Sequence, residues 1–356
     1  NNKNGVMFSH GRVALYSLFK LWGLSNDEII CPAYTCVVVP NAIVLSGNIP
    51  VFIDCEKNSW NMSYEEIEKN ITNKTRAIVV THLFGYPMDV CKIQRIVSEA
   101  EIKYKKKIYV IQDCAHSFGC EWNGQIVTKF GDASFFGLNI SKIITSVFGG
   151  IVITDDAKLY KGLIEFRKTN FKKGILKNIK RLVYFLTTCI IFNQYIYGII
   201  NWLENKGFLD AFVKYYDENI IDFPKDWKEL PCHIEAIIGL SQLKKYDYII
   251  NQKRKNSLLW FEEIKNNNDL MILDYDKGTT FSHCVALTPK RKELLETYRT
   301  KGIQLGIIIE YCIPEMPSFK KYNQGKEFPI SSYYSKSTVN FPNWANLSKK
   351  YRIASS

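Results

Sequence analysis

Residues 11–155 alternate short apolar, β-branched runs with segments of helical periodicity. This alternation is typical of a mostly parallel sheet with helices on both faces, because each parallel strand needs a crossover connection. Ser63 and Glu66 form a capping box and predict the start of one helix. The predicted strands are residues 29–34, 50–54, 77–82, 108–112, 133–137 and 150–154, and the predicted helices are residues 11–22, 37–46, 64–70, 88–100 and 158–168.

The second half of the chain predicts a smaller α+β unit. With 356 residues, of which 46% are hydrophobic, the chain can form two domains. We expect an α/β fold with a large domain at 1–247, interrupted by an insertion at about 172–224, and a small C-terminal domain at 248–356. The expected later elements are helices at 233–246, 248–265 and 291–301 and strands at 281–287 and 305–309.

Three features at predicted strand ends indicate the chemistry. Asp113 directly follows one apolar run, Lys142 comes after another, and Gly149 and Gly150 stand at the start of a third. Parallel sheets bind ligands at the carboxyl ends of their strands. A pyridoxal phosphate (PLP) enzyme needs a carboxylate for the pyridine nitrogen, an amine for the Schiff base, and room beside the ring. Taken singly, Asp113 could be a helix cap and Lys142 a solvated lysine.

Several ordered blocks resemble the DegT/DnrJ/EryC1/StrS family of PLP-dependent sugar aminotransferases. The similarity covers nearly the whole chain except the insertion, and Lys142 stands seven residues before the glycine pair, as the family's Schiff-base lysine does. The resemblance implies the aspartate-aminotransferase type fold (fold type I) and a homodimer. The remaining blocks are SHGRVAL at 9–15, PAYTC at 32–36, HLFGYP at 82–87, QDCAHSFG at 112–119, and EA, GL and QL within 235–243.

The resemblance also implies an activity. Family members transfer an amino group from glutamate or glutamine to a keto nucleotide sugar, in amino-sugar and surface polysaccharide biosynthesis. Lys142 would bond to PLP and then move the proton between the substrate carbon and the cofactor carbon, while Asp113 pairs with the pyridine nitrogen. A subgroup that dehydrates sugars has His in place of this lysine, so Lys142 favours transamination.

Further cofactor contacts follow from the resemblance. His116 would lie near a cofactor oxygen, and Thr35 and Cys36 beside the ring. Gly11 and Arg12 open a predicted helix, whose N-terminus suits the phosphate. Two positions depart from the family. The phosphate-binding hydroxyl comes from Ser134, which stands farther from the lysine than in the family, or from elsewhere in the chain. Lys228 occupies the place of an Asn that reaches the phosphate from the partner subunit.

Two other functions remain open on the sequence alone. The displaced serine and the unusual Lys228 are compatible with a non-catalytic relative that serves as a binding or regulatory subunit. A PLP enzyme acting on a lipid-linked or non-sugar substrate is the other alternative.

The insertion contains an apolar segment, residues 182–203, that would span about 33 Å as a helix. Lys180, Thr187, Gln194 and Asn201 recur every seven residues and form a thin polar stripe. A single membrane crossing is excluded because the flanking segments belong to one predicted domain. Two alternatives remain: residues 172–208 contact the membrane surface, with the basic cluster at 168–181 on acidic headgroups, or they pack on protein as a hydrophobic arm.

Charge and cysteine content limit the partners and the compartment. The net charge is +12, but the chain has no helix-turn-helix, RNA-binding aromatic motif or zinc finger, so we expect no nucleic-acid partner. Ten cysteines without tight spacing indicate reduced thiols, and no metal pattern is present. The first nine residues lack the build of a signal peptide. We therefore expect a cytoplasmic protein, with peripheral contact at the inner face of the membrane as an added expectation.

Overall fold

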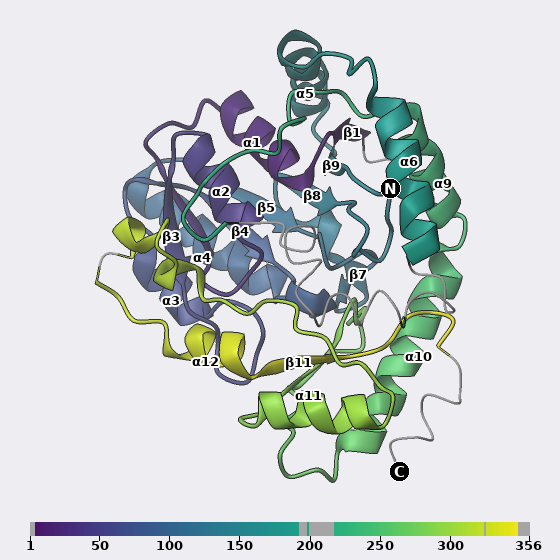
Figure 1. Cartoon of the computed structure of the whole chain (residues 1–356). Coiled ribbons are helices and arrows are strands. Elements are labelled where there is room, and N and C mark those ends of the chain that lie inside the picture. The colour runs from purple at the N-terminus through teal and green to yellow at the C-terminus, as the bar shows by residue number, and fades with distance from the viewer. Residues whose placement is uncertain (1–3, 192–197, 199–216, 324, 348–356) are drawn as a thin grey trace.

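The computed structural model describes residues 4–191, 198, 217–323 and 325–347. Its centre is a seven-stranded sheet in the order β1-β9-β8-β5-β4-β2-β3 (Figure 1). The strands β3, β2, β4, β5 and β8 are parallel, which confirms the predicted parallel sheet. The strand bounds are Asn4–Phe8 for β1, Glu28–Pro32 for β2, Ile49–Ile53 for β3, Thr75–Thr81 for β4, Tyr109–Asp113 for β5, Ala133–Gly137 for β8 and Gly150–Thr154 for β9.

One edge of the sheet differs from the sequence prediction. β9 runs antiparallel to β8 and to β1, and β1 was not predicted at all. The five residues of β1 (NGVMF) include only three apolar side chains, so local periodicity carries little strand signal there. β1 exists because β9 offers it a free edge to pair with.

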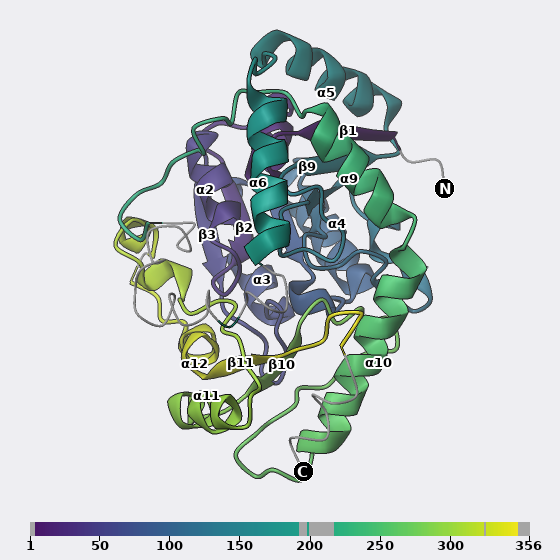
Figure 2. The ribbon, with the colours of Figure 1, turned by 45° about the vertical axis from the view of Figure 1, so that its right-hand side comes forward.

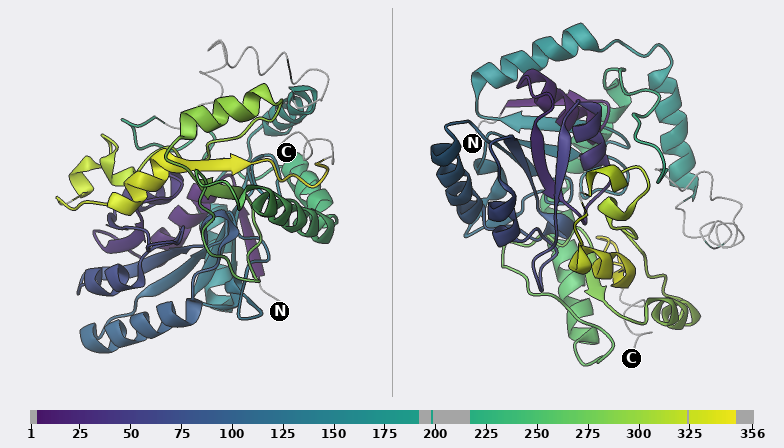
Figure 3. Two further views of the ribbon diagram at one scale, coloured as in Figure 1. Left: turned by 90° about the horizontal axis from the view of Figure 1, so that it is seen from below. Right: turned by 90° about the vertical axis from the view of Figure 1, so that its left-hand side faces the viewer.

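Both faces of the sheet are covered by helices (Figure 3). On β4, Ala77 and Val79 pack into one core while Ile78 and Val80 pack into the other, because successive side chains point to opposite faces. Burial on both sides explains why the parallel strands read as continuous apolar runs. The helices of this domain are α1 (Gly11–Leu21), α2 (Val38–Leu45), α3 (Tyr64–Asn70), α4 (Val90–Tyr104) and α5 (Ala157–Asn170).

Helix α3 begins at the predicted cap. The Ser63 hydroxyl accepts a hydrogen bond from the Glu66 N–H at 3.5 Å, and Glu65 and Glu66 place negative charge in the first turn. Short elements connect the larger ones: strands β6 (Glu121–Trp122) and β7 (Gln125–Ile126), and the 3₁₀ turns η1 (Leu83–Gly85), η2 (Val127–Lys129), η3 (Ile313–Glu315) and η4 (Lys320–Tyr322).

The C-terminal part of the chain, which the sequence predicts to be a smaller unit, gathers at one end of the molecule (Figure 2). Its strands β10 (Cys284–Leu287) and β11 (Thr338–Phe341) pair antiparallel. The predicted strand at 305–309 is wrong, because Gly306 makes only an isolated bridge with Asn340. A buried apolar run does not by itself distinguish a strand from irregular core structure. The remaining elements are α9 (His233–Leu243), α10 (Tyr246–Ile264), α11 (Arg291–Thr300) and α12 (Pro329–Ser337).

Part of the insertion forms helix α6 (Lys177–Ile191), which lies beside α9 along one flank of the molecule (Figures 1 and 2). Lys177 and Arg181 were expected among the basic residues on lipid headgroups, but they turn inward and form ion pairs with Asp226. The apolar residues Ile179 and Leu186 are exposed instead. The later part of the predicted apolar segment, with the stripe residues Gln194 and Asn201, lies outside the described residues.

None of the helices in the described ranges has the length and apolarity needed to cross a bilayer.

The glycine pair, Gly149 and Gly150, lies where two backbone segments approach closely. A Cβ at Gly150 would lie 2.5 Å from the N and Cα atoms of Gly11, and a Cβ at Gly11 would lie 3.2 Å from Gly137 Cα. His10 also forms a bridge with Gly149. The pair therefore lets β9 pack backbone to backbone against the start of α1. Room beside a cofactor ring stays a prediction.

Gly150→Ala should destabilise the fold, because the new methyl group meets backbone atoms that cannot rotate away. We expect the free energy of unfolding to fall by about 2 kcal/mol, measured by urea denaturation of the cofactor-free protein. Gly306→Ala is the matched control, since its Cβ would make only an ordinary contact of 3.6 Å with Asn340 Nδ2. Equal stability of the two variants would contradict the close-approach account.

Candidate active site

Asp113 lies at the carboxyl end of β5, between the ends of two neighbouring strands. Its Cα partners are Thr81 on β4 and Phe135 on β8. The Thr81 hydroxyl donates to Asp113 Oδ2 at 3.2 Å, and the Ala115 N–H donates to Oδ1 at 3.0 Å. Both carboxyl oxygens are therefore held, and the carboxyl group has a fixed orientation.

Burial raises the pKa of Asp113 to about 6, although the hydrogen bonds from Ala115 and Thr81 and the charge of Lys142 work in the opposite direction. Only 4% of the residue is exposed. A buried carboxylate with an elevated pKa gains most from a cation placed against it. The site of Asp113 therefore suits a protonated ring nitrogen.

Lys142 lies in the loop between β8 and β9, residues 138–149, and is half-buried. Burial lowers its pKa, and the nearby Cys36 and Asp113 oppose part of that change. A Cβ added at Gly137 would lie 3.6 Å from Lys142 Cε, so this side chain folds back over the end of β8. A lysine with a lowered pKa has more of the neutral amine that attacks a carbonyl carbon.

His116 lies close enough to Lys142 for the lysine's charge to act on its pKa, and its contact with a cofactor oxygen stays a prediction. Its Nδ1 accepts a hydrogen bond from the Phe84 N–H at 3.4 Å, and its ring stacks on the Phe84 ring at 5.8 Å with an interplanar angle of 16°. Burial lowers the pKa of His116 well below its usual value, and the charges of Lys142 and His283 add to the effect. His116 is therefore neutral, with its proton on Nε2.

Sequence reasoning missed His283, which precedes β10 in the small unit. Its ring centroid lies 4.8 Å from that of His116, and its Nδ1 lies 3.0 Å from the Ser282 hydroxyl. Burial, together with the charges of Lys253 and Lys142, lowers the pKa of His283 well below its usual value. No local motif marks this histidine, because the docking of the two units brings it to the site.

That docking uses main-chain hydrogen bonds. The Thr280 N–H donates to Gly85 O and the Ser282 N–H donates to Phe84 O, each at 3.0 Å. Phe84, Gly85 and Phe281 all have positive φ, and two of them are not glycine. The turn after β4 and the segment before β10 thus hold each other in unusual conformations at the rim of the site.

The N-terminus of α1 lies next to the same strand ends, through the contacts of Gly11 with Gly137 and Gly150. His10 occupies the N-cap position, and no side chain caps the helix. An uncapped N-terminus offers N–H donors to an anion such as a phosphate. The Arg12 guanidinium points elsewhere, because its Nη1 donates to Asp222 O at 3.0 Å.

The other predicted residues differ in how far the structure brings them to the site. Thr35 is buried and Cys36 is half-buried after β2, and Cys36 lies near enough to Lys142 to influence its pKa. Ser134 is buried inside β8 in register with Gln112, and its hydroxyl has no partner in the described part of the chain. The Lys228 ammonium lies 4.9 Å from the centre of the Trp227 ring. The phosphate roles of Ser134 and Lys228 stay predictions.

The residues present fit PLP. A buried acid of elevated pKa, an amine of lowered pKa and an uncapped helix N-terminus gather at one rim of the sheet. They match the pyridine nitrogen, the aldehyde and the phosphate of the cofactor, respectively. In the ranges that the structure describes, no group of three or more His, Cys, Asp or Glu side chains is placed to hold a metal ion.

Comparison with known sequences points the same way. The sequence profile of the DegT/DnrJ/EryC1/StrS aminotransferase family matches residues 1–185 and 200–354. The chain is also 30% identical, over 352 residues, to a GDP-perosamine synthase from Escherichia coli O157:H7. That alignment covers 97% of this chain and 82% of the relative.

Solved structures support the fold. A sugar aminotransferase from Micromonospora echinospora superposes with a TM-score of 0.77 at 19% identity, covering 98% of this chain and 85% of that one. The E. coli GDP-4-keto-6-deoxy-D-mannose-3-dehydratase, solved with bound hydrated PLP, superposes with a TM-score of 0.75 at 20% identity, covering 99% and 88%. The predicted PLP-transferase fold is confirmed.

Asp113→Asn should make the cofactor-free protein relatively more stable as the pH rises. A folded-state pKa of about 6, above the unfolded value, means that ionisation of Asp113 costs stability between about pH 4 and pH 6. The variant lacks this cost. We expect the unfolding free energy of the variant, minus that of wild type, to rise by about 2 kcal/mol between pH 4 and pH 7, as measured by urea titrations.

The matched comparison is Asp132→Asn, which removes a half-exposed carboxylate that accepts from the Val110 N–H at 2.8 Å. This variant should lose stability at neutral pH. A pH-independent difference between wild type and Asp113→Asn would contradict the burial argument.

Proposed function

Because the chain belongs to the DegT/DnrJ/EryC1/StrS aminotransferase family, and is thus a PLP-dependent aminotransferase, we propose that its amino acceptor is a keto sugar carried on a nucleotide. Glutamate or glutamine is the proposed amino donor, and amino-sugar and surface polysaccharide biosynthesis is the proposed pathway class. The observation that carries the proposal is the placement of Lys142 and Asp113 in one site.

The chain's own residues supply binding and proton transfer. PLP, when bound, supplies an aldehyde that captures amines and a ring that accepts electrons. Lys142 Nζ would hold the cofactor covalently, and its neutral amine would accept and return a proton at the reacting carbon of the substrate. Asp113 would pair with the ring nitrogen and favour its protonated form, and neutral His116 would offer its Nε2 proton to an oxygen acceptor.

The substrate class rests on the relatives. The E. coli relative carries the name of a GDP-sugar enzyme, and another relative is named for a UDP-linked aminosugar transamination. An excess of basic residues, +12 in net charge, suits a diphosphate-linked substrate. Lys142 supports amino transfer over the dehydration for which one structural neighbour is named.

A homodimer is part of the proposal, with the apolar surface of α6 and α9 as the contact between copies. Ile179 on α6 and Ile237 and Leu240 on α9 are each more than half exposed. The alternative partner of residues 172–208 is the inner face of the membrane. This alternative has less support because Lys177 and Arg181 point inward. The proposed location is the cytoplasm.

The test is reductive trapping followed by a substrate panel. Purified protein loaded with PLP and treated with borohydride should carry the cofactor on the peptide containing Lys142, as read by mass spectrometry. Lys142→Ala should lose the visible absorbance of lysine-bound PLP and all amino transfer, while Lys158→Ala, an exposed lysine of α5, should keep both.

Glutamate consumption with a panel of nucleotide-linked keto sugars then identifies the acceptor. Failure to bind PLP covalently at Lys142 would favour the non-catalytic binding or regulatory subunit. Covalent binding without turnover on any nucleotide sugar would favour a lipid-linked or non-sugar substrate.

A further inference from the structure

The loop that carries Lys142 is held in a strained conformation. Its two ends are joined by a hydrogen bond from the Leu138 N–H to Gly149 O at 2.9 Å, and the Ser146 N–H donates to Leu138 O at 2.9 Å. Val147, a β-branched residue, has a φ of 73°, where such side chains are rarely found. A loop in this state keeps its shape only if its surroundings enforce it.

Helix α9 supports one side of this loop. A Cβ at Gly239 would lie 3.3 Å from Ser146 Cβ, so α9 and the loop are in direct contact. Ser146 donates through its hydroxyl to Phe148 O, which ties the side chain to the strained turn. The contact with α9 fixes the loop at Ser146. The Phe148 side chain is held by a different part of the chain.

The insertion supplies that contact. The Arg181 guanidinium carbon lies 3.8 Å from the centre of the Phe148 ring, and the Tyr184 ring lies 5.0 Å from it. Both residues are on α6. A guanidinium over an aromatic face is attracted by the ring quadrupole, and more strongly when water is excluded, as it is for an Arg181 side chain only 12% exposed.

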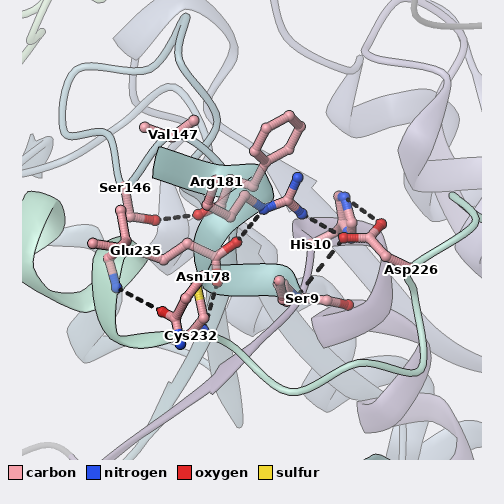
Figure 4. Close-up of polar contacts among 12 residues, drawn as sticks. Ser9, His10, Ser146, Val147, Asn178, Arg181, Asp226, Cys232 and Glu235 are labelled. Carbon is pink, nitrogen blue, oxygen red and sulfur yellow. Dashed lines mark hydrogen bonds and ion pairs between the residues drawn. The ribbon is translucent and has the colours of Figure 1, made fainter. Parts of the chain in front are cut away.

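Arg181 is itself immobilised by two carboxylates (Figure 4). Its Nε donates to Glu235 Oε1 at 2.8 Å, and its Nη2 donates to Asp226. Glu235 is fully buried, and its second oxygen accepts from the Cys232 N–H at the start of α9. The guanidinium is thus fixed between α9, the segment before it and the lysine loop.

We propose that Arg181 is a positioning residue for Lys142, so that helix α6 of the insertion acts as a brace on the catalytic loop. The proposal rests on the proposed function, because positioning matters only if Lys142 bonds to PLP. It assigns an intramolecular role to a segment that the sequence marked only as apolar and basic. A small misplacement of the lysine amine is expected to slow the reaction without changing how the sugar binds.

The experiment uses two variants that remove the contact from opposite sides. Arg181→Met removes the guanidinium, and Phe148→Leu removes the ring while leaving the ion pairs with Glu235 and Asp226 intact. In the PLP-loaded enzyme, each should lower kcat about 10-fold to 100-fold with KM for the sugar within about 2-fold, and should shift the pH midpoint of the visible absorbance of lysine-bound PLP.

Hydrogen exchange supplies a readout that needs no cofactor. Amides of residues 138–149 should exchange faster in both variants of the cofactor-free protein, and the double variant should be no faster than either single one. Arg181→Lys should fall between wild type and Arg181→Met, because lysine keeps a cation but cannot bridge two carboxylates. Lys180→Met, at the exposed neighbouring position, is the control and should match wild type in every measurement.

The proposal would be overturned if a folded Phe148→Leu or Arg181→Met protein had the same kcat, absorbance midpoint and loop exchange rates as wild type. If Arg181→Met does not fold, Phe148→Leu decides alone. Loss of covalent PLP binding in wild type would instead refute the proposed function, so the two failures are distinguishable.

Discussion

The backbone contact among Gly11, Gly137 and Gly150 is the constraint on which the site depends. Three chain segments meet there with no side chain between them, so the start of α1 lies against the ends of β8 and β9. The loop between those strands carries Lys142, whose Cε folds back over the end of β8, the strand next to β5, and whose charge acts on Asp113. A helix N-terminus, an amine and an acid therefore share one rim, and their mutual burial produces the shifted pKa values.

Local patterns predicted much of this architecture. The parallel strands and their helices follow from apolar runs and caps such as Ser63, because burial on both faces leaves a strong local signal. The direction of β9, the existence of β1 and the pairing of β10 with β11 depend on contacts distant in sequence, so periodicity could not supply them. Asp113, Lys142 and His116 were predicted because local patterns mark them. His283 was not, because tertiary docking brings it next to His116.

The basic residues of the insertion show that a charge pattern can give a wrong prediction when the ion-pair partners are distant in sequence. Lys177 and Arg181 read as part of a solvated basic cluster, yet Asp226 and Glu235 draw them inward from positions about 50 residues away. The exposed side chains of the helix include large apolar ones, such as Ile179 and Leu186. Helix α6 thus has two faces of different character: an ionic one that reaches the loop of Lys142, and one that carries exposed apolar side chains.

We propose that Asp113 pairs with the pyridine nitrogen of PLP and that Lys142 bonds to its aldehyde, at opposite ends of one ring. The most direct measurement is the ¹⁵N NMR shift of the pyridine nitrogen in protein loaded with ¹⁵N-labelled PLP. We predict a protonated nitrogen at neutral pH in wild type and an unprotonated one in Asp113→Asn. An unprotonated nitrogen in wild type, or the same protonation state in both proteins, would contradict the account.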